Sequence, residues 1–539
     1  MDQEFTIELQ PIGRRARVEA GRSVLAAAQS VGVELQAVCG GAGTCGQCKV
    51  RCVSGILARP TFEEVEQLGK ANIEAGYRLA CRATAQSDLQ IEIPPESLTS
   101  SQRVQVEGGE RCVPVDSVLS LKVLAAENPI LGLAIDLGTT KIAGYLVDLE
   151  SGSTVAACGR MNPQIVNGED VISRIAFANK SERERGRLRE QIIEAVNELT
   201  EELCQEAHTS VEHVFEAVIA GNTAMHHLCL GLPVHQLGIA PYLPASTKPS
   251  YRPAKEMGLR LAATAKVYMP PIIAGYVGGD HVAMLLGVDQ KNGPQPALAI
   301  DIGTNTELTL SVNGRLYSCS CASGPAFEGA HIKHGMRAAP GAIERVQFEA
   351  GVIQYYTIGR KPPVGICGSG ILDAIAALLD AGVLDDRGNF QRDVAAFRAG
   401  GNPNEFLLAS AEETKNGNGV VLTREDISEI QFAKAAIRAG IEILLRAGSI
   451  EVNSLASVVI AGAFGSYLDM RSAVRIGMFP DIPLARFRQV GNAAGLGARF
   501  LLASASARRA GEELAEQINY VELTNHPKFH EQFVKALLF

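Results

Sequence analysis

The sequence contains no tryptophan and has fewer basic than acidic residues. Aromatic residues make up 5% of the 539 residues, and 50 Lys and Arg stand against 59 Asp and Glu, for a net charge of -9. A protein that binds nucleic acid needs a basic surface, often with aromatic side chains on which bases stack. We therefore expect no nucleic acid among its partners.

Long apolar segments are also missing. No uninterrupted apolar run reaches the roughly 18 residues of a transmembrane helix, so we expect no membrane span. The segment from Met1 to Leu9 lacks the cationic and apolar parts of a signal peptide. Twelve cysteines in 539 residues are too sparse for a disulfide scaffold, and reduced thiols with a metal site are typical of a cytosolic protein. We expect a cytoplasmic location.

Four cysteines suggest what that metal site is. Cys39, Cys45 and Cys48 have the spacing Cys-x5-Cys-x2-Cys in a glycine-rich segment, and Cys81 follows at a distance. Four thiolates in a three-plus-one arrangement suit an iron–sulfur cluster, and the glycines let the backbone approach a small inorganic core. Zinc is the alternative, but zinc sites favour paired Cys-x2–4-Cys hooks, and one pair is missing here. Cys52 is interpreted as a packed core thiol rather than a ligand.

The segments around these cysteines predict a small domain over residues 1–95. Alternating residues predict a hairpin, followed by a helix over 23–31, the cysteine segment and further strands. This order resembles the [2Fe-2S] ferredoxins of the β-grasp fold, and the cysteine spacing is that of their adrenodoxin and putidaredoxin branch. The resemblance implies a [2Fe-2S] cluster on Cys39, Cys45, Cys48 and Cys81.

From residue 131 the pattern changes to alternating strands and helices, with an internal duplication. Residues 133–140 and 298–305 are identical at six of eight positions. A repeat over so long a distance predicts two homologous lobes rather than a solenoid. The expected domains are a ferredoxin-like domain, a linker with a short strand at 118–124, a first lobe and a second lobe, at residues 1–95, 96–130, 131–290 and 291–539.

Both copies contain an Asp-x-Gly-Thr turn after an apolar strand. No Gly-x4-Gly-Lys-Ser/Thr motif of a P-loop NTPase occurs. Backbone amides and threonine hydroxyls of such a turn can cradle phosphate oxygens, and the aspartate can hold Mg²⁺ through water. The residues predicted to bind ATP phosphates in the two turns are Asp136, Gly138, Thr139, Thr140, Lys141, Asp301, Gly303, Thr304 and Asn305.

Two further glycine segments complete the predicted nucleotide site. Gly368 and Ser369 open a helix, and the turn from Gly462 to Gly465 is expected to take the adenosine. Over residues 131–505 this order of elements resembles the superfamily of acetate and sugar kinases, heat-shock chaperones and actin (ASKHA). The fold class is therefore expected to be α/β and α+β multidomain, a β-grasp ferredoxin domain followed by a two-lobed ASKHA ATPase.

The combination of both modules resembles the reductive activators of corrinoid proteins. The segments that begin at Gly221, Ala274, Cys321 and Asn519 look like that family's own. The resemblance implies ATP-dependent electron transfer from the cluster to cob(II)alamin, giving cob(I)alamin for a methyltransferase or O-demethylase system. It also implies ATP and Mg²⁺, an upstream low-potential reductant and a homodimer. Larger members carry a middle domain, for which the segment before residue 131 leaves no room.

Other functions and residues stay open. Cys319 and Cys321 face one side of a strand as core thiols, or hold a [4Fe-4S] cluster as in activators of 2-hydroxyacyl-CoA dehydratases. A small-molecule kinase with an attached ferredoxin domain is a further alternative. His226 and His227 are interpreted as helix-packing residues, since neighbours on a helix face different directions.

Three further polar residues are candidates for a catalytic role or for partner contact. Glu328 lies in a loop rich in glycine and alanine and is a candidate for positioning the attacking water. Asn222 and Asp280 stand beside glycines at strand ends and are candidates for partner contact at the cleft edge.

Overall fold

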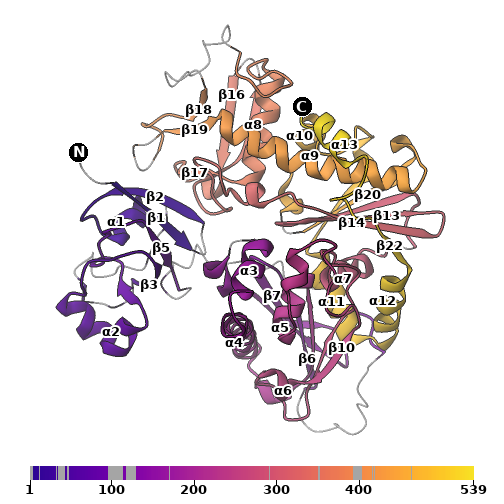
Figure 1. The fold of residues 1–539 in the computed structure, drawn as a ribbon, viewed down its shortest axis with the longest axis horizontal. Helices are drawn as coiled ribbons and strands as arrows, with labels where there is room; N and C mark the ends of the chain where they lie inside the picture. Colours follow the sequence, from indigo (N-terminus) through magenta and orange to yellow (C-terminus); the bar gives the residue numbers. More distant parts are fainter. Residues whose placement is uncertain are drawn as a thin grey trace. The chain divides into compact units, whose positions relative to one another are not determined.

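The computed structural model describes residues 4–10, 13–31, 33, 35, 43–44, 46, 48–94, 97, 113–116, 129–168, 170–290, 292–349, 352–391, 404–414, 417, 419–462 and 464–539. The chain divides into two compact units: residues 1–103 with 325–433 and 538–539, and residues 104–324 with 434–537 (Figure 1). No helix within these described ranges is long and apolar enough to cross a membrane. The strand expected at 118–124 lies outside the described residues.

The first unit begins with a mixed five-stranded sheet in the order β2-β1-β5-β3-β4. β1 is antiparallel to β2 and parallel to β5, and its alternating residues Phe5, Ile7 and Leu9 enter the core. The helix α1 (Val24–Ser30) begins after the N-cap Ser23 and packs its apolar residues into the same core. The strands are β1 (Glu4–Gln10), β2 (Arg14–Glu19), β3 (Lys49–Ser54), β4 (Tyr77–Leu79) and β5 (Leu89–Glu92). The expected β-grasp ferredoxin fold is confirmed.

The second unit contains two six-stranded sheets whose topologies match over five strands. In each sheet a three-stranded antiparallel meander is extended by a parallel strand next to its first strand. The first sheet has the order β10-β11-β9-β6-β7-β8, and the second has the order β21-β20-β12-β13-β14-β22. The duplication predicted from the sequence therefore extends to five strands of each sheet, whereas the sixth strands, β10 and β22, lie at opposite edges.

The two apolar strands predicted before the Asp-x-Gly-Thr turns are β6 and β12 of these sheets. Those of the first sheet are β6 (Leu131–Leu137), β7 (Lys141–Asp148), β8 (Thr154–Met161), β9 (Val214–Gly221), β10 (Ser250–Pro253) and β11 (Lys266–Met269). Those of the second are β12 (Ala297–Ile302), β13 (Thr306–Val312), β14 (Arg315–Cys321), β20 (Ser457–Ala461), β21 (Phe487–Gly491) and β22 (Ile518–Tyr520).

Two helices, one from each repeat, pack against each other, and glycines lie at their closest contacts. They are α7 (Gly279–Gly287) and α11 (Ala493–Ala503), which lie side by side in Figure 1. A Cβ on Gly497 would lie 1.7 Å from Ala283 O, and one on Gly287 would lie 2.5 Å from Ala493 O. Helix α11 of the second repeat packs in the core of the first sheet. The two halves of the unit are therefore joined by the packing of a helix from one repeat against the sheet of the other.

The remaining elements cover the sheets or form smaller ones. The other helices are α2 (Phe62–Glu74), α3 (Val171–Ala178), α4 (Glu182–Glu206), α5 (Thr223–Leu230), α6 (Ala254–Met257), α8 (Gly368–Asp380), α9 (Arg424–Ala447), α10 (Met470–Arg475), α12 (Ala505–Gln517) and α13 (Phe529–Ala536). The small sheets contain β15 (Ala342–Glu349), β16 (Val352–Thr357) and β17 (Gly365–Ile366), and β18 (Glu405–Ala409) with β19 (Val420–Thr423).

Candidate cluster and nucleotide sites

Two of the four predicted cluster ligands, Cys48 and Cys81, face each other in the ferredoxin domain. Their Sγ atoms are 3.4 Å apart. A disulfide would bring them to about 2.05 Å. Two thiolates on one tetrahedral metal, with bonds of about 2.3 Å, would lie roughly 3.7 Å apart, so this pair fits two ligands of a single iron. Cys39 and Cys45 lie outside the described residues.

A buried ion pair supports the Cys81 side of this site. Glu64 in α2 accepts hydrogen bonds from Arg78 Nε and Nη2, both at 2.8 Å, and from the N–H of Leu79 at 3.1 Å. The same carboxylate closes a capping box with Thr61. The bidentate pair fixes β4, and with it the backbone that leads to Cys81. Helix α2 was not predicted from the sequence.

Cys52 lies in β3 and packs against the ferredoxin core while half-buried. Its Sγ contacts Ser54 O at 3.5 Å, and burial raises the pKa of the thiol. This placement agrees with the predicted packed thiol.

Four half-buried carboxylates gather around the ends of the two central strands of the second unit. Asp136 and Asp301 are the penultimate residues of β6 and β12. Asp280 lies in the first turn of α7, and Glu307 lies in β13. Burial, followed by repulsion from Asp301 and Asp136, raises the pKa of Asp280 to about 8. Burial and repulsion from Asp136 raise the pKa of Asp301 to about 7. Burial and repulsion from Asp280 and Asp301 raise the pKa of Glu307 well above its ordinary value.

Asp136 differs from the other acids because an amide holds it. Asn492 Nδ2 donates to Asp136 Oδ2 at 2.8 Å, while Asn492 Oδ1 caps α11 by accepting from the N–H of Gly495. Burial raises the pKa of Asp136 to about 6, and the hydrogen bond from Asn492 opposes that rise. The acid of the first repeat is thus anchored by a residue of the second.

The first phosphate turn is narrow and firmly held. A Cβ on Gly138 would lie 2.6 Å from Lys141 O, so only glycine fits there. Thr139 and Thr140 are buried, and Thr139 Oγ1 accepts a hydrogen bond of 2.8 Å from Asn222 Nδ2. Asn222 also caps α5 by accepting from the N–H of Met225. The structure therefore places Asn222 beside the phosphate turn.

The second turn is held by different groups. The N–H of Gly303 donates to Asn305 O at 3.0 Å, and Ser323 Oγ donates to Thr304 O at 3.4 Å. Ser323 Oγ also shares a hydrogen bond of 2.9 Å with Thr306 Oγ1. Hydroxyl groups here replace the amide that supports the first turn.

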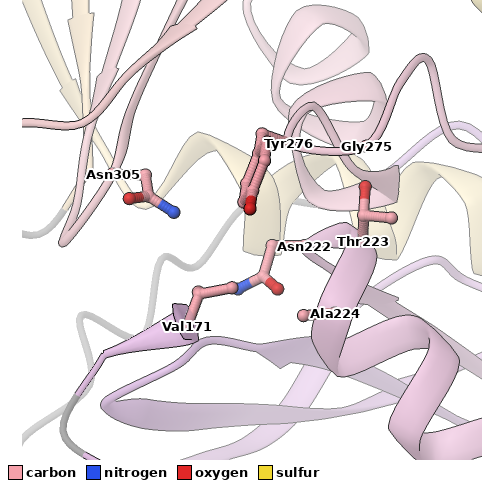
Figure 2. A pocket seen from close by; sticks show the side chains of 7 residues that line it. All are labelled: Val171, Asn222, Thr223, Ala224, Gly275, Tyr276 and Asn305. Carbon is pink, nitrogen blue, oxygen red and sulfur yellow. The ribbon is translucent and has the colours of Figure 1, made fainter. Parts of the chain in front are cut away.

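A small pocket lies beside Asn305 of the second turn and the start of α5, as Figure 2 shows. In Figure 2 the side chains of Tyr276 and Asn222 lie between Asn305, from the second repeat, and the first turn of α5. Tyr276 is fixed by a hydrogen bond from its hydroxyl to Leu237 O at 2.6 Å. Both repeats thus contribute polar side chains to one space.

The predicted glycine segments take different positions. Gly462 has φ +89°, and a Cβ there would lie 2.4 Å from Ile302 O and 3.1 Å from Asp301 Oδ1. Gly465 packs against Ile460 of β20. Gly462 thus borders the second turn directly.

The remaining predicted residues lie in the first unit. Gly368 and Ser369 begin α8, where Ser369 Oγ donates to Glu344 O at 3.0 Å. Glu328 forms an ion pair of 3.5 Å with Arg337.

The second pair of cysteines is buried and closely packed. Cys319 and Cys321 are fully buried, and a Cβ on Gly440 of α9 would lie 2.4 Å from Cys321 Sγ. Burial and the neighbouring Cys321 raise the pKa of Cys319 well above its ordinary value, which keeps it a neutral thiol. The core-thiol interpretation fits this packing.

The two histidines of α5 are buried in packing positions. His227 Nδ1 contacts Thr223 O at 2.8 Å, and its Nε2 accepts from the N–H of Ala245 at 3.0 Å. Burial lowers the pKa of His226 to about 3, so it is neutral. The burial of both side chains is consistent with the predicted helix-packing role.

The acidic cluster suits a hydrated cation. In the described part of the chain, no three His, Cys, Asp or Glu side chains are arranged to hold a metal ion by themselves. Mg²⁺ commonly keeps several waters and binds through one or two carboxylates plus substrate phosphates. Burial, and to a smaller extent repulsion between the carboxylates, raises the pKa of Asp280 and of Asp301, and a bound cation would stabilise their charged forms.

A ferredoxin domain joined to a duplicated ASKHA fold defines an iron–sulfur protein with a nucleotide-binding module. Family models agree: a 2Fe-2S cluster-binding domain matches residues 7–86, the RACo middle region matches 131–292, and the C-terminal ASKHA domain of RACo matches 295–539. The chain belongs to the RACo family. The expectation that it lacks a middle domain is wrong, because the segment predicted as the first lobe is that middle region.

Similar proteins span most of the chain. The corrinoid activation enzyme RamQ of Eubacterium limosum is 36% identical over 422 residues, covering 77% of this chain and 71% of the relative. A reductase of Methanosarcina barkeri for a Co(II) methylated amine-specific corrinoid protein is 27% identical, covering 72% of each chain. The solved structure of a reductive activator for corrinoid, iron-sulfur protein is 33% identical, with TM-score 0.70, over 99% of this chain and 98% of that one.

Proposed function

We propose that this protein reductively activates a corrinoid protein, passing an electron from its [2Fe-2S] cluster to cob(II)alamin at the expense of ATP. The observation that carries the proposal is the joining, in one chain, of the Cys48–Cys81 thiol pair with twin Asp-x-Gly-Thr turns around an acidic cluster. The corrinoid substrates named for two relatives support the choice of acceptor. The product is cob(I)alamin, used by a methyltransferase or O-demethylase system.

The cluster would be held by Cys39, Cys45, Cys48 and Cys81. When bound, it supplies a one-electron carrier, with a potential near about −400 mV in plant-type ferredoxins. Glu64 and Arg78 hold β4 in place and so fix the approach of Cys81 to its partner. An upstream low-potential reductant would supply the electron.

The ATP phosphates would lie between the two turns. The first turn offers the Thr139 hydroxyl and backbone amides, oriented by Asn222. The second turn offers Thr304 and Asn305, with Asp301, Asp280 and Glu307 on the side that takes Mg²⁺ through water. Asp136 keeps its hydrogen bond to Asn492 and so serves mainly to position α11. Gly462 leaves space next to Asp301 for the nucleotide.

ATP would drive the reaction by favouring one conformation of the protein. A nucleotide can shift an equilibrium only by its differential affinity for the two states. Because each turn belongs to a different repeat, bound phosphates favour the state in which both turns reach them. Helices α7 and α11, which pack closely at Gly287 and Gly497, would couple the two repeats in this change. The same state would bind the corrinoid protein so that reduction of cobalt becomes feasible.

An anaerobic stopped-flow experiment tests the proposal. The protein is mixed with a cob(II)alamin-loaded corrinoid protein and a reductant, with and without MgATP, and the cob(I)alamin absorbance is followed. We expect formation of cob(I)alamin that depends on ATP and stops in the Cys81→Ser variant. A Cys52→Ser variant is the matched control and should react like the wild type. Equal rates with and without ATP would contradict the proposal.

A further inference from the structure

The backbone carbonyls of the first phosphate turn point into the interior. Asn162 Nδ2 donates to Gly138 O at 2.9 Å, Arg174 Nη2 donates to Thr139 O, and the N–H of Asn162 donates to Thr140 O at 2.9 Å. In a trans peptide unit the C=O and N–H point in opposite directions. The amides that follow these carbonyls therefore face away from the interior, as a phosphate-binding turn requires.

Arg174 is a fully buried side chain of α3. Its Nε donates to Gly168 O at 2.9 Å, and its Nη1 contacts Gln164 Oε1 and Met225 Sδ at 3.3 Å each. A Cβ on Gly168 would lie 2.7 Å from Arg174 N, so the chain needs glycine there. Burying a guanidinium is costly unless its donors are satisfied. The surrounding backbone is built to keep this side chain directly behind the turn.

We propose that Arg174 is a positioning residue for phosphate binding. It fixes the peptide unit between Thr139 and Thr140 and polarises it, because a charged donor on the carbonyl makes the N–H of the same unit a stronger donor. That N–H then donates to a phosphate oxygen of the nucleotide. The inference rests on the proposed function, since it needs a nucleotide phosphate at this turn.

Binding measurements on three variants test this role. Affinities for MgATP, MgADP and adenosine are measured by calorimetry for the wild type, Arg174→Gln, Arg174→Lys and Arg189→Gln. Arg189 is the matched control, since it is a half-buried arginine of α4 that donates to Met257 O at 2.9 Å. We expect Arg174→Gln to weaken MgATP and MgADP binding by about tenfold or more, with Arg174→Lys intermediate and Arg189→Gln unchanged. Adenosine binding should be the same in every variant.

The outcomes separate this inference from the proposed function. If the wild type fails to bind MgATP, the proposed function is contradicted. If the wild type binds and a folded Arg174 variant binds equally well, only the positioning role is overturned. An equal loss for adenosine and MgATP also overturns it, because that pattern reflects general structural damage. Should Arg174→Gln fail to fold, Arg174→Lys decides, because lysine keeps the buried charge but not the fixed guanidinium geometry: an unchanged affinity for MgATP in that variant overturns the positioning role.

Discussion

The two phosphate turns have nearly the same sequence and the same place in their sheets, yet their surroundings differ. Asp136 accepts a hydrogen bond from Asn492, whereas Asp301 stands among carboxylates. A guanidinium and an amide hold the carbonyls of the first turn, while the Ser323 hydroxyl reaches Thr304 O in the second. The two turns therefore differ in function: we infer that the first turn binds phosphate and that the second binds the cation.

Replacing each aspartate by asparagine gives the largest expected effect. Asp301→Asn removes a charge from the proposed cation side, and we expect ATP hydrolysis to fall by about 100-fold. Asp136→Asn retains the shape next to Asn492 and should cost about tenfold or less. Steady-state hydrolysis of ATP in both variants measures this, with thermal unfolding as the control for folding. Equal losses would remove the distinction between the turns.

Asn492→Asp would make the first turn resemble the second. The new carboxylate would face Asp136 at hydrogen-bond distance. Asp136 would also lose the amide donor that now holds it. We expect the free energy of unfolding to fall by about 2–3 kcal/mol at neutral pH, with partial recovery at pH 5, where carboxylates protonate. Urea unfolding at both pH values measures the effect. Unchanged stability at neutral pH would show that Asn492 does not anchor Asp136.

The glycine contacts of α7 and α11 can also be compared between repeats. Gly497→Ala and Gly287→Ala should each destabilise the protein by about 1–3 kcal/mol, with the larger loss for Gly497, whose added Cβ would lie closer to a carbonyl oxygen. Gly186→Ala in α4 is the matched control. Nothing lies within 4 Å of its Cβ position, so alanine should stabilise the helix by about 1 kcal/mol. Thermal unfolding that left all three variants alike would contradict the close packing.

Magnesium binding should depend on pH. Asp280 and Asp301 have pKa values of about 8 and 7 in the folded protein, above the unfolded value of about 3.9. The folded state therefore binds more protons, so the stability of the cation-free protein falls as pH rises from about 4 to 8. Over the upper part of this range Mg²⁺ competes with fewer protons, and its affinity should rise by up to about tenfold per pH unit. Calorimetric titration at pH 6, 7 and 8 measures this, and a flat profile would contradict the cation site.

Removing the hydroxyl of the second turn gives the smallest effect. Ser323→Ala leaves Thr304 O and Thr306 Oγ1 without that partner and should cost about 1 kcal/mol of stability. The affinity for MgATP should fall only a few-fold, less than in Arg174→Gln. Side-by-side titrations of the two variants make the comparison. A larger loss in Ser323→Ala would reverse the assignment of the phosphate-holding turn.

The strands and both turns could be predicted from the sequence because their signals are local. An apolar strand followed by Asp-x-Gly-Thr indicates its own turn, and repetition makes the signal stronger. Glu307 was missed because an acidic residue in the strand after a turn cannot be told from the sequence apart from one that faces solvent. Arg174 and Asn492 were missed because they reach the turns from distant parts of the chain, and only the packing of α3 and α11 brings them there.

The most direct measurement is which turn binds the cation. Mn²⁺, a paramagnetic substitute for Mg²⁺, is titrated into the protein with bound ADP. Electron paramagnetic resonance counts the bound ion in the wild type, Asp301→Asn and Asp136→Asn. The account predicts that Asp301→Asn loses at least about tenfold in Mn²⁺ affinity, while Asp136→Asn stays close to the wild type. Loss of the ion in Asp136→Asn with retention in Asp301→Asn would contradict it.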